Sequence, residues 1–134
     1  HRSLPHTADV IVEAWGPTRD ACLRHAVLGL VATFADVGDV TASASVARSF
    51  PADSGENLLV ALLEEILYLL DAENQVPVDV TITSAADGGL DGAFHVAPAA
   101  ALDQRGAVPK AITHHGMELR RNAGAWRCRV TVDV

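Results

Sequence analysis

The sequence has few cysteines, few aromatic residues and few basic residues. Two of its 134 residues are cysteine, 4% are aromatic, and ten Lys and Arg stand against seventeen Asp and Glu, which gives a formal charge of −7. Cys22 and Cys128 lie far apart and outside any zinc-type spacing, so we expect small buried apolar side chains, with a disulfide as the less favoured alternative. The negative charge is the wrong sign for general binding to nucleic-acid phosphates, so we expect any RNA to be held by a partner protein.

The sequence also lacks long apolar runs and the standard nucleotide-binding and hydrolase motifs. Its longest apolar run, residues 58–70, is interrupted by Glu64 and Glu65 and is too short to span a membrane. Because no basic segment followed by an apolar one stands at the start, we expect a cytoplasmic protein without membrane contact. There is no G-x-G-x-x-G after a strand, no Walker loop, no G-x-S-x-G and no H-E-x-x-H. We therefore expect neither nucleotide binding nor hydrolase chemistry in their usual forms.

What is present fits one small globular domain. Hydrophobic residues make up 49% of the chain, enough to fill a single core, so we expect one domain over residues 1–134. Periodicity and turn residues predict helices and strands in a mixed order without sustained β-α-β alternation. The predicted class is therefore α+β, an antiparallel or mixed sheet with two main helices packed on one side. The predicted helices are 19–35 and 56–71, and the predicted strands are 10–15, 40–50, 78–84, 90–96, 110–121 and 126–134.

Acidic residues near both ends of the chain suggest a cation site. The last predicted strand ends in Asp133 beside Val134, and the first follows Asp9, which has apolar neighbours. If the two strands pair so that Asp9 lies beside Asp133, these carboxylates and the terminal carboxylate of Val134 supply three oxygen ligands for a hard cation. The simpler readings are that Asp9 caps the start of its strand and that Asp133 is merely solvated.

The six histidines are a weaker indication of metal or acid–base chemistry. His114 and His115 are adjacent, and neighbours in a strand point to opposite faces, so both cannot easily bind one metal. His115 could join His6 at a site. Taken singly, each histidine is better explained as a structural or surface residue.

Four segments together resemble the archease family in order and spacing over nearly the whole chain. The first is the run from His6 to Val10, which reads H-T-A-D-V. The others are L-L-V at residues 58–60 with E-I-L-Y-L-L-D at 65–71, K-A-I-T at 110–113 with His115-Gly116, and V-D-V at 132–134. None of these motifs is specific alone, but their combination is.

The resemblance implies a small α+β protein that is not itself an enzyme but activates an RtcB-type RNA ligase in tRNA splicing or RNA repair. Such proteins promote guanylylation of the ligase and allow it to turn over repeatedly, and they reach RNA only through the ligase. The family's metal ligands fall on Asp9, Asp133 and Val134. This all-oxygen set suits Ca²⁺, Mg²⁺ or Mn²⁺ better than zinc, with Ca²⁺ expected in a crystal and Mg²⁺ or Mn²⁺ in function.

Three further residues of the matching motifs are expected to surround the metal or to contact the partner: His6, Lys110 and His115. The alternative is a chaperone-like adaptor that binds protein partners and uses the metal only as a structural clamp. An independent metal-dependent hydrolase is a weaker third reading, because no nucleophile or base has a recognisable setting.

Overall fold

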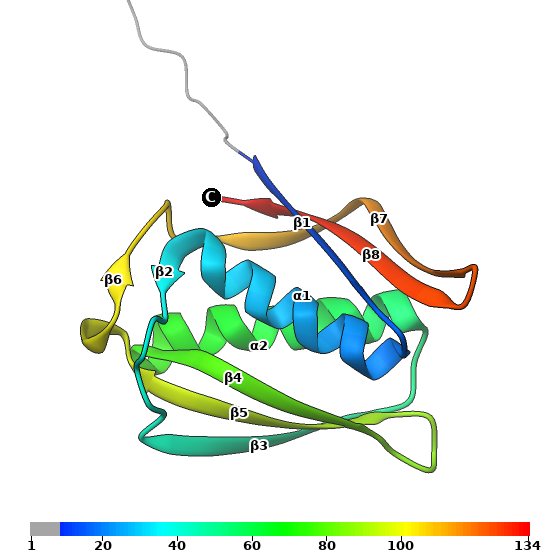
Figure 1. Cartoon of the computed structure of the whole chain (residues 1–134), viewed down its shortest axis with the longest axis horizontal. Helices are drawn as coiled ribbons and strands as arrows, with labels where there is room; N and C mark the ends of the chain where they lie inside the picture. The colour runs from blue at the N-terminus through cyan, green and yellow to red at the C-terminus, as the bar shows by residue number, and fades with distance from the viewer. Residues whose placement is uncertain (1–8) are drawn as a thin grey trace, which may run out of the picture.

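The computed structural model describes residues 9–134, which form two α-helices and eight β-strands (Figure 1). In chain order the elements are β1 (Asp9–Gly16), α1 (Arg19–Phe34), β2 (Ala35–Asp36), β3 (Ala44–Phe50), α2 (Gly55–Glu73), β4 (Gln75–Ser84), β5 (Leu90–Pro98), the short 3₁₀ helix η1 (Ala99–Ala101), β6 (Asp103–Gln104), β7 (Ala111–Asn122) and β8 (Ala125–Asp133). No helix in this part of the chain is long and apolar enough to cross a membrane.

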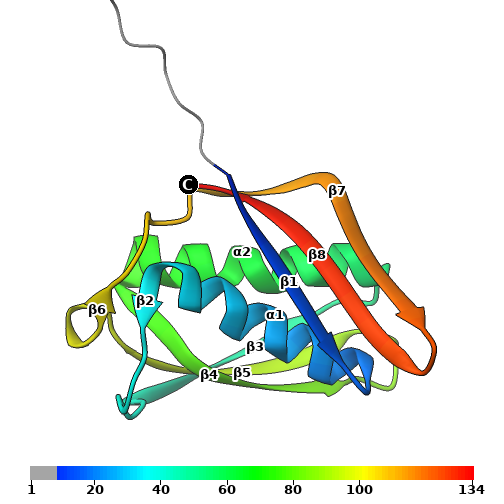
Figure 2. The same cartoon turned by 45° about the horizontal axis from the view of Figure 1, so that its top comes forward.

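The strands form three antiparallel sheets. The first sheet has the order β1-β8-β7, the second sheet has the order β3-β5-β4, and β2 and β6 make a short two-stranded ribbon. β8 is therefore the middle strand of the first sheet although it comes last in the chain. The end of β8 lies beside the start of β1 (Figures 1 and 2).

The two helices lie between the first and second sheets (Figure 1). α1 packs against β1 and β4, and α2 packs against β7 and β4. Along β8, Cys128, Val130 and Val132 are buried while Arg127 and Arg129 are exposed, the two-residue alternation of a strand with one buried face. The apolar side chains of both sheets and both helices form one buried core.

Local sequence explains where the helices begin and end. The Thr18 hydroxyl accepts a hydrogen bond from the Ala21 N–H at 3.1 Å, and the Ser54 hydroxyl accepts one from the Asn57 N–H at 3.2 Å, which caps both N-termini. α2 ends at Asn74, whose φ of 53° is left-handed, as is common after a helix C-terminus. Its seven buried residues, five of them leucine, each contribute about 1.5–3 kcal/mol of burial.

The junction between β1 and α1 requires a glycine. A Cβ on Gly16 would lie 2.8 Å from the Cys22 backbone nitrogen, so a larger residue would push the first turn of α1 away from the strand. Cys22 itself is buried, and its thiol donates to the Ala14 carbonyl at 3.6 Å. Cys22 and Cys128 are both free and buried, as predicted from their separation and from the lack of a zinc-type spacing.

The predicted class, the two helices and the terminal hairpin are confirmed. The strands, however, divide between sheets, so the helices cover the inner face of each sheet and not one side of a single sheet. The strand predicted over 40–50 begins only at Ala44, because the Val40 N–H donates back to the Val37 carbonyl at 2.9 Å in a turn and the chain bends at Ser43. The ribbon of β2 and β6 was not predicted, since two-residue strands carry no periodicity.

A wide bulge interrupts β7. Its pairing with β8 shifts between Thr113, opposite Thr131, and Glu118, opposite Arg129. Residues 114–117 thus oppose the single residue Val130, and Gly116 adopts a φ of +68° there. His114 and His115 both lie in this bulge and are exposed, so the alternation of a regular strand, from which opposite faces were expected for them, is interrupted at these two residues.

Candidate metal site

The structure brings Asp9 and Asp133 together. Strands β1 and β8 pair in a register that sets Asp9 directly opposite Asp133. Both side chains belong to the outer face of the first sheet, because Val12 on β1 and Val132 on β8 are buried in the core and side chains alternate along a strand. The pairing expected from the two ends of the sequence is present.

The pKa of the Asp133 carboxyl is raised because the Asp9 carboxyl lies beside it. A protonated Asp133 can donate a hydrogen bond to Asp9, which raises the pKa of the Asp133 carboxyl above its ordinary value, and desolvation and the negative charge of Asp9 raise it further. Two carboxylates this close repel each other when both are ionised, and either a proton or a cation relieves that repulsion. Asp9 is exposed and Asp133 is partly exposed, so solvent ions can reach the pair.

Backbone contacts fix the end of β8 that carries this pair. The Lys110 N–H donates to the Asp133 carbonyl at 2.7 Å, and Ala111 pairs with Asp133 across β7 and β8. Val134 is partly buried and packs against the core. Held from both neighbouring strands, Asp133 and Val134 have a fixed position relative to Asp9.

The donor set fits a hard cation if Val134 contributes. Within residues 9–134 no group of three His, Cys, Asp or Glu side chains is placed to hold a metal ion. The acid pair therefore needs a donor of another kind, and the oxygens of Val134 are adjacent to it in the chain. A set made only of oxygen atoms matches Ca²⁺, Mg²⁺ and Mn²⁺.

Of the three residues expected around the metal or at the partner contact, two lie in the described part of the chain. His6 lies outside the described residues. Lys110 reaches Asp133 through its backbone. His115 lies farther along β7 in the bulge, and within residues 9–134 no hydrogen bond or ion pair joins it to the acid pair.

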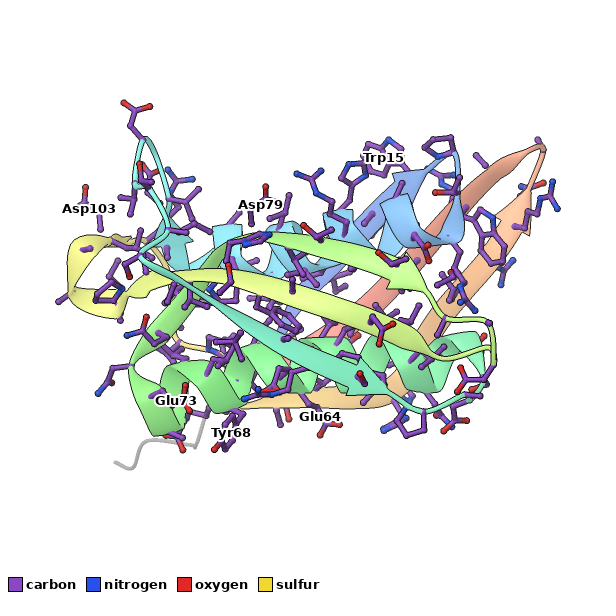
Figure 3. The ribbon with its side chains drawn as sticks, turned by 90° about the horizontal axis from the view of Figure 1, so that it is seen from below. Trp15, Glu64, Tyr68, Glu73, Asp79 and Asp103 are labelled. Atoms are coloured by element: carbon purple, nitrogen blue, oxygen red, sulfur yellow. The ribbon has the colours of Figure 1, made fainter. Side chains whose placement is uncertain are left out.

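Two surface features were not found by reasoning from the sequence. The first is an open groove of about 670 Å³ between the end of α2 and the segment before β7, where Lys110 also lies. It brings together Tyr68, Asp71 and Val108, and Figure 3 shows Tyr68 on the exposed side of α2. The second is a depression of about 240 Å³ on the outer face of the first sheet, lined by Trp15, three arginines and two glutamates. The alternating arginines of residues 127–129 were the available signal for the second.

Fold and site together define a class: a small α+β protein with a carboxylate pair held where its first and last described strands meet. The family model of the Archease protein family (MTH1598/TM1083) matches residues 1–134. The chain therefore belongs to the archease family.

Relatives and solved structures agree with this assignment. The chain is 47% identical over 134 residues to the probable protein archease of Mycobacterium tuberculosis (strain ATCC 25618 / H37Rv), covering 100% of this chain and 74% of that protein. It is 29% identical over 141 residues to the protein archease of Pyrobaculum neutrophilum, covering 100% of this chain and 95% of that protein.

Two solved structures share the fold. Protein 1598 of Methanobacterium thermoautotrophicum aligns with a TM-score of 0.77 at 26% identity, over 98% of this chain and 96% of that one. An archease from Thermotoga maritima, described as a possible chaperone, aligns with a TM-score of 0.71 at 18% identity, over 100% of this chain and 97% of that one.

Proposed function

We propose that this protein is a cytoplasmic, non-enzymatic activator of an RtcB-type RNA ligase in tRNA splicing or RNA repair. In this role it promotes guanylylation of the ligase and lets the ligase turn over repeatedly. It acts through a divalent cation bound by Asp9, Asp133 and Val134. The observation that carries the proposal is the direct pairing of Asp9 with Asp133 in a member of the archease family.

The residues of the chain have distinct parts in this proposal. Asp9 and Asp133 present two carboxylates on one exposed sheet face, and their mutual repulsion favours a bound cation over an empty pair. Lys110 fixes the end of β8 through its backbone N–H. A bound divalent ion would supply positive charge that offsets the phosphate charge of a nucleotide transfer. The site opens to solvent, so a partner can approach it.

A multiple-turnover RNA ligation assay with a purified partner ligase tests the proposal. The parent protein should accelerate ligation, while Asp9→Ala and Asp133→Ala should remove most of that acceleration. Asp91→Ala is the matched control, because Asp91 is an exposed aspartate on the second sheet and bonds only the Ser49 hydroxyl at 2.9 Å among the described side chains. Equal stimulation by the Asp9 and Asp133 variants would contradict the proposal.

The second candidate is a chaperone-like adaptor whose metal is only a structural clamp. It is favoured by the exposed Ile11 and Trp15 on the outer face of the first sheet, which are 48% and 60% exposed, since exposed apolar side chains mark protein contacts. Metal removal distinguishes the two candidates. A chelator should abolish ligase stimulation in the first case, whereas in the second it should chiefly lower the melting temperature.

A further inference from the structure

The outer face of the first sheet carries a cluster of cations beside an exposed indole. Trp15 on β1 lies directly opposite Arg127 on β8, and Arg127 lies directly opposite Arg120 on β7. Side chains opposite each other on one face of a sheet have Cβ atoms about 4.5–5.5 Å apart. One indole and two guanidinium groups thus stand in a single row across the sheet, at the end far from Asp9.

Two glutamates in the next row of the same sheet pair with two of the three arginines and leave Arg127 without a carboxylate partner among the described residues. Arg129 Nη1 lies 3.8 Å from Glu13 Oε1, and Arg120 Nη2 lies 2.9 Å from Glu118 Oε1, so each of these arginines has a carboxylate partner. Within residues 9–134, neither an ion pair nor a side-chain hydrogen bond involves Arg127. Arg127 is therefore an exposed cation between two partly neutralised ones, in a setting suited to one added anion.

The shape of the surface also suits a ligand. The depression of about 240 Å³ is lined by Trp15, by three arginines and by two glutamates, so its cations outnumber its anions by one: Arg120, Arg127, Arg129, Glu13 and Glu118. Trp15 is 60% exposed, and it lies at the edge of the molecule, away from Tyr68 on α2 (Figure 3). Its backbone is held in place, since the Trp15 carbonyl lies 2.6 Å from His25 Nδ1 on α1. A fixed strand thus presents an exposed ring.

We propose that this face binds single-stranded RNA, with a base stacked on Trp15 and the adjoining phosphate on Arg127 and Arg120. An indole beside exposed guanidinium groups, of which Arg127 has no carboxylate partner among the described residues, suits a single strand, because every base has a stacking face and every phosphate is an anion. An acidic peptide would use the arginines but would leave Trp15 without a stacking partner. A duplex would offer no unstacked base to Trp15.

The overall charge of −7 limits this contact to a short segment of strand. The wider surface repels a phosphate backbone, so we expect weak binding that becomes useful when a partner already holds the RNA. In that respect the inference rests on the proposed function, in which the ligase supplies the RNA. It also extends that function, because the RNA is then touched by this protein as well as by the ligase.

The inference is tested by fluorescence anisotropy with a labelled single-stranded RNA decamer and the full chain alone. Trp15→Ala should weaken binding about 5- to 150-fold, the cost of losing one stacked base. Arg127→Gln should weaken binding and lower the slope of log affinity against log salt by about one. Binding of the parent should be lost when an excess of unlabelled single strand is added.

Matched controls come from other surfaces. Tyr68→Ala removes an aromatic ring that is 53% exposed on α2, and Arg105→Gln removes an arginine that pairs with Asp36 at 3.1 Å. Both should bind the decamer as the parent does, and thermal melts should show all four variants folded. The inference is overturned if the parent does not bind, if the controls weaken binding as much as the test variants, or if polyglutamate, duplex RNA or a mononucleotide binds as tightly as the decamer.

A second measurement separates this inference from the proposed function. Asp9→Ala should lose ligase stimulation yet keep its affinity for the decamer, because Asp9 lies at the other end of the sheet face. Metal-dependent stimulation without RNA binding would defeat only the RNA inference. RNA binding by a protein that does not stimulate the ligase would defeat only the proposed function.

Discussion

The two three-stranded sheets are built alike but leave different outer faces. Each sheet buries its inner face against the helices. On the outer face of the second sheet, His95 lies between two hydroxyls, with Ser45 Oγ 2.8 Å from Nδ1 and Thr81 Oγ1 2.9 Å from Nε2. The polar groups of this row bind one another, so the row needs no ligand.

The outer face of the first sheet is not satisfied in this way. Asp9 and Asp133 face each other with charges of the same sign, Arg127 has no carboxylate partner among the described residues, and Ile11 and Trp15 expose large apolar surfaces. Like charges held side by side repel each other, and exposed apolar side chains gathered on one face mark contact sites. The unpartnered charges and exposed apolar side chains thus lie on the first sheet, which is where both proposals place binding, whereas the polar row of the second sheet is paired within itself.

The largest expected effect is on the rate at which cysteines are alkylated, which should differ between the inner and outer faces of the sheets. Burial raises the pKa of the Cys128 thiol to about 12 and also raises that of Cys22. Because only the thiolate reacts, folded protein at pH 8 should be alkylated at Cys128 about a thousandfold more slowly than a free thiol. Mass spectrometry after iodoacetamide treatment measures this rate. A cysteine introduced on either outer face, by Glu13→Cys or Thr83→Cys, should react quickly, and rapid labelling of the parent would contradict the buried placement.

A second test asks whether both inner faces belong to one core. Phe94 on β5 is fully buried, so Phe94→Ala should lower the free energy of unfolding by about 3–5 kcal/mol. Urea denaturation followed by circular dichroism measures the change in midpoint at constant slope. Thr83→Ala, on the exposed face of the neighbouring strand β4, should change stability by less than about 0.5 kcal/mol. A loss below about 1 kcal/mol for Phe94→Ala would show that the second sheet is not part of a shared core.

A third test asks whether a cation binds the outer face of the first sheet and not that of the second. Ca²⁺ or Mn²⁺ at about one hundred times its dissociation constant should stabilise the parent by about 2.7 kcal/mol, because the ion binds the folded acid pair and not the unfolded chain. Differential scanning fluorimetry with and without a chelator reads this shift. Asp133→Asn should lose the shift, whereas Asp91→Asn on the second sheet should keep it. If both variants keep it, the ion binds elsewhere.

The smallest expected effect lies on the second sheet and depends on pH. Burial alone would raise the pKa of the Asp79 carboxyl, but the Val80 N–H and the Arg24 guanidinium, 2.9 Å away, hold it below its ordinary value. A lowered folded-state pKa stabilises the protein above the unfolded value near 4, and this stability is lost as pH falls through the folded value.

Asp79→Asn should therefore cost about 0.2–1 kcal/mol at pH 7, since the pair is half exposed. Its difference from the parent should shrink below pH 4. Urea midpoints at pH 7 and pH 3 test the sign, and a difference that grows in acid would contradict it.

Much of the fold could be predicted because its elements carry strong local patterns. The leucine face of α2 and the alternation of β4 and β8 each specify their own secondary structure. The pairing of Asp9 with Asp133 could also be predicted, because they are the polar breaks in two apolar strand ends and because the sequence resembles a family in which they are expected to bind a metal; the metal site itself stays a prediction.

The remaining features depend on contacts that no local pattern contains. The division of the strands between two sheets is decided by which face of α1 and α2 each strand covers. The bulge at residues 114–117 follows from the pairing of β7 with a strand that has fewer residues over the same stretch. The row of Trp15, Arg127 and Arg120 exists only once three strands are in register. These residues are unremarkable in sequence and become neighbours through tertiary pairing.

The position of β8 between β1 and β7 has a consequence for how the molecule folds. β1 and β7 have no ladder with each other in the described part of the chain; both depend on β8. Neither strand can complete its hydrogen bonds before β8 (residues 125–133) pairs with it. The pairing of β1 with β8 closes a loop of more than a hundred residues. Long loop closure slows folding, so the helices and the second sheet should collapse first, and the acidic end of the first sheet should form among the last parts of the molecule.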